Sequence, residues 1–228
     1  MNMRMLRLFA STALLAGTAA HAQIATPEWE AGKHYFLIDP AQPTGSGDKI
    51  EVTEVFSYGC PACNFSYVAV DKLRKDLPAN AVMNYVPASF KPNEDWPMFQ
   101  RAYFAAKALG IADKAHDAMF DAVWKTGELA IMDKTTNQLK QPMPTIADAA
   151  KFYANYGVKA EDFIATANSF TMNTRMKQAD AYIKATGVES TPTIIVNGKY
   201  RLTPTSAGGG WEKAEALVLY LVRKESTK

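Results

Sequence analysis

The segment that most constrains the fold is Ser57-Tyr58-Gly59-Cys60-Pro61-Ala62-Cys63, which carries the only two cysteines of the chain. An apolar run, Ile50–Phe56, precedes this segment and predicts a buried strand. After it, apolar residues recur at helical spacing until Pro78, at Phe65, Val68, Leu73 and Leu77. The cysteines therefore lie where a strand ends and a helix begins. Pro61 suits the first helical position, because its missing N–H would have no partner there.

This placement predicts a reactive thiol. The first turn of a helix presents unpaired N–H groups and the positive end of the helix dipole, which favour a thiolate over a thiol. A lowered pKa makes Cys60 a nucleophile near neutral pH and a good leaving group from a mixed disulfide. Cys63 is one helical turn deeper on the same face, close enough to form a disulfide with Cys60. We therefore expect Cys60 to be the exposed, attacking sulfur and Cys63 to be the resolving one.

Two other interpretations of the cysteine pair are weaker. A purely structural disulfide across so short a loop removes little entropy from the unfolded chain. A tetrahedral zinc site needs four ligands, whereas the sequence has no second cysteine pair and its His34 and His116 are isolated. We expect no metal site and no cofactor other than the redox-active disulfide itself.

The first residues have the pattern of an export signal. Arg4 and Arg7 precede an apolar run at residues 8–15, and Ala20-His21-Ala22 fits a signal-peptidase site. We expect residues 1–22 to be a signal peptide that is cleaved before Gln23, and the mature chain to be exported to a compartment where disulfides persist. No other stretch is apolar for long enough to span a bilayer.

The charge of the mature chain gives no sign of a polyanionic partner. Without Arg4 and Arg7 it has 23 basic residues, from a total of 25, against 23 acidic ones. A balanced surface of this kind provides no electrostatic basis for binding nucleic acid or anionic lipid. About 200 residues suffice for a substantial core, as one domain with an insertion or as two small domains.

The rest of the chain interrupts a sheet pattern with helices. Residues 35–38 and 81–86 predict strands on either side of the cysteine unit, and the second one completes a β–α–β unit with a parallel strand pair. A proline-rich linker then leads into five amphipathic helical segments, at 98–109, 113–125, 145–157, 160–167 and 171–186. The sheet pattern returns as strand 193–196, the turn Asn197-Gly198, strand 199–202 and a terminal helix at 211–223.

This order of elements resembles a thioredoxin fold interrupted by an all-helical domain, and more narrowly the DsbA family of periplasmic thiol:disulfide oxidoreductases. The resemblance covers essentially the whole mature chain. Its most specific parts are residues 54–63, Ala108-Leu109-Gly110 and residues 192–200. It implies an α/β fold with a thioredoxin-like domain at residues 23–92 and 175–228 and a helical insertion at residues 93–174.

The resemblance also implies roles for residues outside the cysteine pair. It implies a cis bond at Thr191-Pro192, in a loop that faces Cys60 and whose backbone pairs with an extended substrate. It places Glu54 at the position of a buried acid beneath the cysteines, where the carboxyl would have a raised pKa and relay the proton of Cys63. A surface glutamate on an edge strand is the alternative. Pro61 and Ala62 are implied to support the active site.

Two residues depart from the pattern of the family. Ala62 stands where the best-known members have histidine, so it supplies neither a hydrogen bond nor a charge to the thiolate. Asn84 stands where members of the family often carry a lysine near the buried acid, so Glu54 is expected to lack that charged partner. Four aromatic residues near the site either line a substrate groove or belong to the core: Tyr58, Phe65, Trp96 and Tyr103.

The function implied is that of a periplasmic oxidoreductase that donates its Cys60–Cys63 disulfide to reduced or unfolded secreted proteins. A DsbB-type, quinone-linked membrane partner would reoxidise it. Alternatives are a disulfide isomerase or reductase, which Thr191 favours, a CxxC metal chaperone, and a non-catalytic chaperone. Only about a dozen residues separate Gln23 from the strand at Tyr35, too few for an extra dimerisation domain, so we expect a monomer.

Overall fold

The computed structural model describes residues 29–227, so the predicted signal peptide lies outside the described residues. A five-stranded sheet with the order β1-β5-β4-β2-β3 forms its centre. β2 and β3 pair in parallel, and the other neighbouring pairs are antiparallel. The strands are β1 (Phe36–Leu37), β2 (Ile50–Phe56), β3 (Ala81–Pro87), β4 (Thr193–Val196) and β5 (Tyr200–Leu202).

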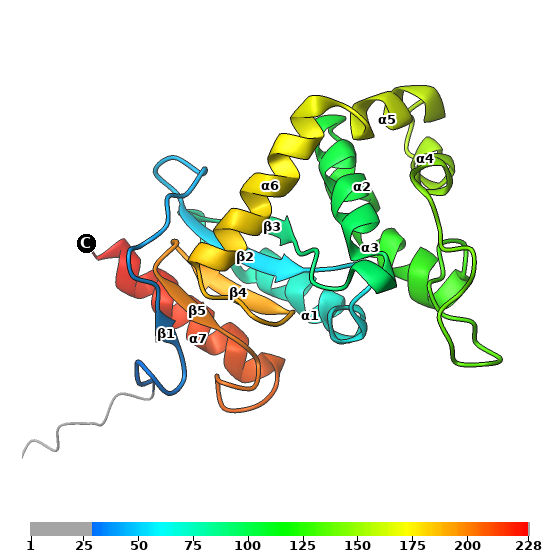
Figure 1. Cartoon of the computed structure of the whole chain (residues 1–228). Coiled ribbons are helices and arrows are strands. Elements are labelled where there is room, and N and C mark those ends of the chain that lie inside the picture. The colour runs from blue at the N-terminus through cyan, green and yellow to red at the C-terminus, as the bar shows by residue number, and fades with distance from the viewer. Residues whose placement is uncertain (1–28, 228) are drawn as a thin grey trace, which may run out of the picture.

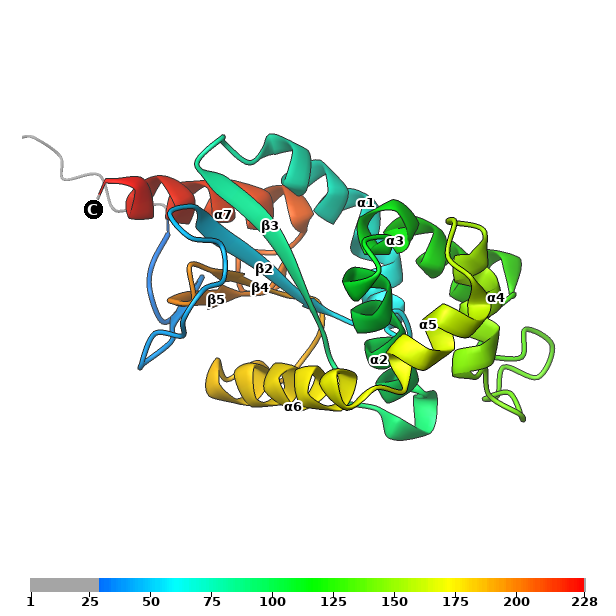
Figure 2. The same cartoon turned by 90° about the horizontal axis from the view of Figure 1, so that it is seen from above.

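Helices cover both faces of the sheet and one of its ends. They are α1 (Pro61–Asp76), α2 (Trp96–Ala108), α3 (Ala112–Asp121), α4 (Ile146–Ala154), α5 (Ala160–Ala167), α6 (Phe170–Ala185) and α7 (Trp211–Ser226), with short turns η1 (Pro92–Glu94) and η2 (Ala122–Thr126). α1 and α7 lie on one face and α6 on the other, while α2 to α5 gather beyond the end of the sheet (Figures 1 and 2). Within the described part of the chain, no helix has the length and apolar character needed to cross a membrane.

The β2–α1–β3 unit that carries the cysteines forms as predicted. β2 is the second strand from the β3 edge, and each of its seven residues is buried. Pro61 occupies the start of α1, and the helix ends one residue before Leu77. The predicted thioredoxin-type arrangement is confirmed, because the parallel pair, the crossover helix and the antiparallel β4–β5 hairpin all lie in one sheet.

The Asn197-Gly198 turn joins β4 to β5 in the left-handed conformation that a tight hairpin requires. Its φ angles are 52° at Asn197 and 64° at Gly198. The loop before β2 packs directly over this turn, and the Gln42 N–H donates to the Gly198 carbonyl at 2.9 Å. A Cβ at Gly198 would lie 2.0 Å from the Gln42 carbonyl oxygen, so glycine is required there for space as well as for conformation.

The segment between β3 and β4 is helical, as predicted, with two differences in detail. The helix expected at 113–125 changes at Ala122 into the π-helical turn η2. The capping box at Thr145 is confirmed: its hydroxyl accepts from the Asp148 N–H, and the Asp148 carboxylate accepts from the Thr145 N–H. The division at residues 93–174 stays a prediction, and its second boundary falls within α6.

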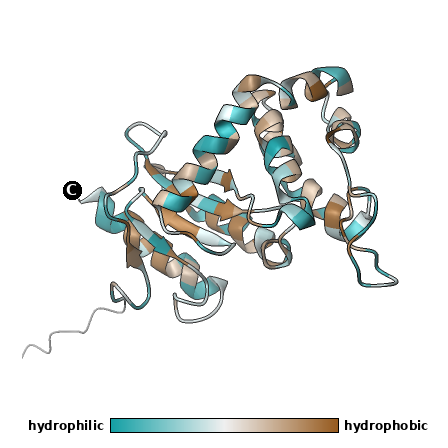
Figure 3. Ribbon diagram, viewed as in Figure 1, coloured by the Kyte–Doolittle hydropathy of each residue, from teal (hydrophilic) through white to brown (hydrophobic). Residues whose placement is uncertain are grey.

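Buried apolar residues form two clusters. The first joins the cysteine turn to α2 and the helices that follow, and it contains Cys60, Cys63, Tyr58 and Phe99. The second lies between the sheet and α7 and contains Val52 and Leu217. The central strands are predominantly hydrophobic, whereas the outer turns of the helices are polar (Figure 3). The cysteines therefore belong to the core that the helical segment completes.

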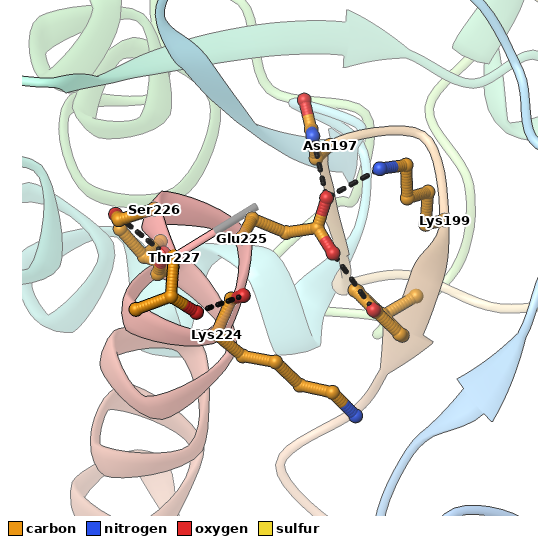
Figure 4. A network of polar contacts seen from close by, with 8 residues as sticks. Asn197, Lys199, Lys224, Glu225, Ser226 and Thr227 are labelled. Atoms are coloured by element: carbon orange, nitrogen blue, oxygen red, sulfur yellow. Dashed lines mark hydrogen bonds and ion pairs between the residues drawn. The ribbon is translucent and has the colours of Figure 1, made fainter.

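A buried carboxylate anchors the end of α7 to the β4–β5 hairpin. Glu225 is 8% exposed and accepts hydrogen bonds from Asn197 Nδ2 at 2.9 Å and from the Tyr200 hydroxyl at 2.8 Å, and it pairs with the Lys199 ammonium. Figure 4 shows the three donors converging on this one carboxylate from the turn and the following strand. This cluster holds the last turn of α7 against the sheet.

We expect Glu225→Ala to lower the free energy of unfolding by about 2–3 kcal/mol, because three donors lose an acceptor in a largely buried site. Urea denaturation measures this. Glu212→Ala, an exposed position on the same helix, is the matched control and should change stability by less than about 0.5 kcal/mol. Equal effects of the two substitutions would show that the Glu225 cluster does not anchor α7.

Candidate active site

The turn between β2 and α1 places the first sulfur at the helix terminus. Cys60 is the N-cap residue of α1, with φ −85° and ψ 118°. Its Sγ accepts a hydrogen bond from the Cys63 N–H at 3.3 Å. A sulfur thus takes the place of the side-chain oxygen that usually satisfies the free N–H groups of a first turn. Both cysteines are free thiols in the structure.

The two cysteines are less accessible than the sequence suggested. Cys63 is 0% exposed, as expected for the shielded partner, but Cys60 is only 4% exposed. The expectation of a freely exposed Cys60 is therefore wrong. The reason is tertiary: the loop that ends in Pro192 folds over the sulfur, and the Cys60 thiol donates to the Thr191 carbonyl at 3.6 Å.

The environment moves the pKa values of the two thiols in opposite directions. The pKa of Cys60 is lowered to about 6, chiefly by a hydrogen bond with the Cys63 side chain. Burial acts in the opposite direction, whereas the Thr191 side chain and the backbone N–H groups of Cys63 and Ala62 lower the pKa further. Burial raises the pKa of the Cys63 thiol well above its usual range, and its hydrogen bond with Cys60 adds to that rise. At neutral pH, Cys60 is thus the thiolate and Cys63 the neutral thiol.

The Thr191-Pro192 peptide is cis, which confirms the expectation that followed from the resemblance. This loop leads directly into β4, the antiparallel neighbour of β2. The Thr193 hydroxyl donates to the Ser190 carbonyl at 2.8 Å and closes the loop on itself. The sheet therefore brings two segments 131 residues apart in sequence into contact at Cys60.

Glu54 lies beneath the cysteines in the centre of the sheet. It is 2% exposed, and β2 has a neighbour on each side, so the alternative of a surface glutamate on an edge strand is wrong. Burial raises the pKa of its carboxyl to about 8, and the charge of Cys60 contributes to that rise. Glu54 is therefore largely protonated at neutral pH and can donate a proton within the protein.

Comparisons with known proteins agree with this geometry. A thioredoxin family model matches residues 47–209. The thiol:disulfide interchange protein DsbA of Pseudomonas aeruginosa is 33% identical over 225 residues, which cover 98% of this chain and 97% of that protein. The chain belongs to the DsbA family. The DsbA of Pseudomonas syringae pv. tomato is 34% identical over 223 residues, with 97% and 96% of the two chains covered. The crystal structure of the oxidoreductase DsbA from Xylella fastidiosa superposes with a TM-score of 0.73 at 32% identity, over 85% of this chain and 96% of that one.

One expectation about this DsbA family member needs correction. Asn84 does not lie beside Glu54, because the β2–β3 register pairs Glu54 with Tyr85 and pairs Thr53 with Asn84. Asn84 is thus on the opposite face of the sheet, where its amide donates to Glu51 Oε1 at 3.2 Å and its carbonyl accepts from Lys107 at 3.0 Å. A shift of one residue in strand register moves a side chain to the other face of the sheet, so the residue beside Glu54 is Tyr85 and not Asn84. The cross-strand neighbour of Glu54 is a tyrosine whose own pKa is raised.

Ala62 leaves the thiolate of this DsbA family member without help from a side chain between the cysteines. Its backbone nevertheless contributes to the lowered pKa of Cys60. The Ala62 carbonyl accepts from the Ser66 hydroxyl at 2.7 Å, and Ser66 accepts from the indole N–H of Trp211 at 2.7 Å. These bonds tie the first turn of α1 to the start of α7.

Residues of the helical segment support the cysteine turn through contacts that the sequence did not predict. The indole N–H of Trp124 donates to the Tyr58 carbonyl at 2.8 Å. His116 Nδ1 and the Tyr58 hydroxyl are hydrogen-bonded at 2.9 Å. Trp96 packs so tightly on Gly59 that a Cβ there would lie 2.8 Å from its indole. No local signal in the sequence pairs these residues, because they meet only across the interface between sheet and helices.

Of the four aromatic residues weighed for a substrate groove, three belong to the core. Tyr58, Tyr103 and Trp96 are between 0% and 5% exposed, whereas Phe65 is 85% exposed on the outer face of α1. Phe65 thus remains available to a binding partner close to the cysteines.

The opposed thiol environments predict a specific titration. In the reduced protein, ultraviolet thiolate absorbance should rise with an apparent pKa of about 6, the value at Cys60. Cys63→Ala should raise this pKa because the largest stabilising hydrogen bond is lost, and Cys63→Ser should raise it less because a donor is kept. If the rise in thiolate absorbance near this pH is absent from Cys60→Ser, the titration belongs to Cys60. Faster alkylation of Cys63 than of Cys60 would contradict the assignment.

A second prediction concerns the buried carboxyl. Because the pKa of Glu54 is raised from 4.5 to about 8, the folded protein binds more protons than the unfolded chain between these values. Its contribution to stability is complete below the lower value and is lost as pH rises through the upper one. Relative to the parent, reduced Glu54→Gln should therefore gain stability from about pH 5 to about pH 9, on the order of 4 kcal/mol.

Urea unfolding of both reduced proteins across this pH range measures the difference, in which the common titration of Cys60 largely cancels. Glu212→Gln replaces an exposed carboxyl and is the matched control. A difference between Glu54→Gln and the parent that does not change with pH would show that Glu54 is ionised in the folded protein.

Proposed function

We propose that this chain is an exported protein dithiol oxidase that donates a Cys60–Cys63 disulfide to reduced secreted proteins. The observation that carries the proposal is the pair of opposed pKa shifts, lowered at Cys60 and raised at Cys63. A stable Cys60 thiolate favours the reduced enzyme, and a dithiol pair with a stabilised reduced form is a strong oxidant. The disulfide carries the electrons, and no further cofactor is part of the proposal.

The reaction proceeds by two exchanges. A substrate thiolate attacks the Cys60 Sγ of the oxidised enzyme, which breaks the Cys60–Cys63 bond and gives a mixed disulfide. Cys63 leaves and takes up a proton. A second substrate thiolate then attacks the substrate sulfur of the mixed disulfide, and Cys60 leaves as the stabilised thiolate. The substrate is oxidised by two electrons, and the enzyme is left reduced.

Each of the other site residues has a place in this proposal. Glu54, protonated at neutral pH by its burial, gives its proton to the leaving Cys63 thiolate. The Thr191 backbone lies against Cys60 and pairs with the extended substrate chain beside the cis proline Pro192. Pro61 starts the helix, and the Ala62 backbone stabilises the thiolate.

The proposal also covers where the enzyme acts and which protein reoxidises it. Residues 1–22 act as the export signal, cleavage before Gln23 releases the protein into the periplasm, and a DsbB-type quinone-linked membrane protein restores the disulfide. The active form is a monomer, since Cys60, Cys63, Glu54 and Thr191 of one chain complete the site. Complementation of a strain that lacks its own periplasmic oxidant tests this setting: rescue should require the quinone-linked partner, and rescue without it would contradict the proposal.

The division of labour between the sulfurs is tested in two assays: the oxidation of a reduced substrate protein, and the reverse exchange of the reduced variant with a substrate protein that already carries a disulfide. Cys60→Ser should abolish disulfide formation, because the attacked sulfur is gone. In the reverse exchange, the Cys60 thiolate of reduced Cys63→Ser attacks the substrate disulfide, which breaks that bond and frees one substrate thiol. The resulting mixed disulfide should accumulate, because no Cys63 thiol remains to release it. Gel analysis without reductant measures both. Unchanged activity of Cys60→Ser, or stoichiometric metal binding without oxidation of the substrate, would overturn the proposed function in favour of a chaperone.

A further inference from the structure

A cavity opens beside the cysteine turn, and Thr191 is not among the residues that line it. Its volume is about 570 Å³, within the range of sites that hold a drug-sized ligand. Its apolar lining comes from three segments: Pro61 of α1, Val123 and Trp124 of η2, and Ile131, Met132 and Leu139 of the following loop. Gly59 also lines it, so the cavity touches both neighbours of Cys60.

An ordered hairpin at residues 131–140 forms the outer wall of this cavity. Met132 and Leu139 face each other across a β-bridge, and the Lys140 N–H donates to the Ile131 carbonyl at 2.9 Å. Asp133 caps the tip by accepting from the N–H groups of Thr135 and Thr136. In Figure 1 the segment between η2 and α4 is a long loop that extends away from the neighbouring helices. The hairpin contributes no residue to the reaction described above.

The inner end of the hairpin is fixed to the core, so the wall is held in place. Ile131 is 2% exposed and belongs to the cluster that contains Cys60. At the floor, the Trp124 indole is oriented by its hydrogen bond to the Tyr58 carbonyl, one residue before Gly59. Met132 and Leu139, by contrast, are only partly buried and face the space beside Pro61.

The apolar surface continues from the cavity along α1. Pro61, Phe65 and Val68 are spaced as one face of the helix, and Phe65 and Val68 are 85% and 65% exposed. This stripe begins at a residue that lines the cavity. An apolar surface of this extent, continuous with a reactive sulfur, fits an extended chain better than a compact ligand.

The charged residues around the cavity do not favour a ligand of one particular charge. The cavity rim carries Glu94, Asp133 and Lys134, with both signs represented. Both chain neighbours of Cys60, Gly59 and Pro61, line the cavity, so a path from the sulfur runs over these two residues. A chain that becomes attached to Cys60 and follows this path enters the cavity.

We propose that the cavity walled by the 131–140 hairpin is a second substrate subsite, which takes a large apolar side chain of an unfolded polypeptide close to its reacting cysteine. This inference rests on the proposed function, because the occupant is the substrate of the Cys60 exchange. At about 3.3 Å per residue, a position two or three residues from the cysteine reaches the cavity from Cys60. The subsite makes the enzyme prefer cysteines with apolar neighbours, which a native protein buries and an unfolded one exposes.

Two reduced peptides test the preference, each with two cysteines and differing only in whether leucine and phenylalanine or alanine flank the cysteines. The oxidised parent should oxidise the apolar peptide about tenfold faster than the alanine peptide, the discrimination available from one apolar pocket. Met132→Ala/Leu139→Ala should reduce this ratio to below about threefold. Gln138→Ala, an exposed position of the same hairpin, is the matched control and should keep the parental ratio.

The ratio of the two oxidation rates, apolar peptide to alanine peptide, does not depend on how much active enzyme a variant preparation contains. Oxidation of the alanine peptide shows that the variant is folded and active. If the double variant oxidises neither peptide, single Leu139→Ala decides the question by the same ratio. A parental ratio near one, or a ratio that the hairpin substitutions leave unchanged, overturns the subsite while the proposed oxidase function stands. Failure of the parent to oxidise either peptide overturns the proposed function itself.

Discussion

Hydrogen bonding from Cys63 to the Cys60 sulfur, through the Cys63 side chain and its backbone N–H, is the interaction on which the rest of the site depends. It exists because α1 begins immediately after Cys60, so the N-cap side chain is a sulfur. A helix terminus stabilises negative charge at its N-cap, and a thiol there ionises more easily than one in solution. The same bond fixes the relative positions of the two sulfurs.

The surrounding fold makes the two cysteines different although they are only three residues apart. Cys63 is directed into the core, where burial keeps it neutral, and the buried Glu54 lies beneath it in β2. Cys60 lies at the surface of the same core, covered by the Thr191 loop. The difference in pKa between the thiols therefore results from depth within one cluster, and it gives each sulfur a distinct chemical role.

The helical segment between β3 and β4 does more than cover the end of the sheet. Trp124 donates to the carbonyl of Tyr58, and Trp96 fills the space that only Gly59 leaves open. The conformation of the cysteine turn is thus held by residues from two helices that follow β3. The hairpin at 131–140 extends the same segment around the turn. Support of the turn and the proposed selection of substrate both depend on this one insertion.

The sequence was sufficient for features that arise from local periodicity and local sterics: the bounds of β2, β4 and α5, the helix start at Pro61, the Asn197-Gly198 turn and the capping box at Thr145. Only the tertiary structure decided the burial of Cys60, the pairing of Glu54 with Tyr85 and not with Asn84, and the contacts of Trp124 and Trp96. Strand register and cover by a distant loop depend on contacts between segments far apart in the chain. A periodic pattern reports which face of an element is apolar, but it does not report which residue of another element lies opposite.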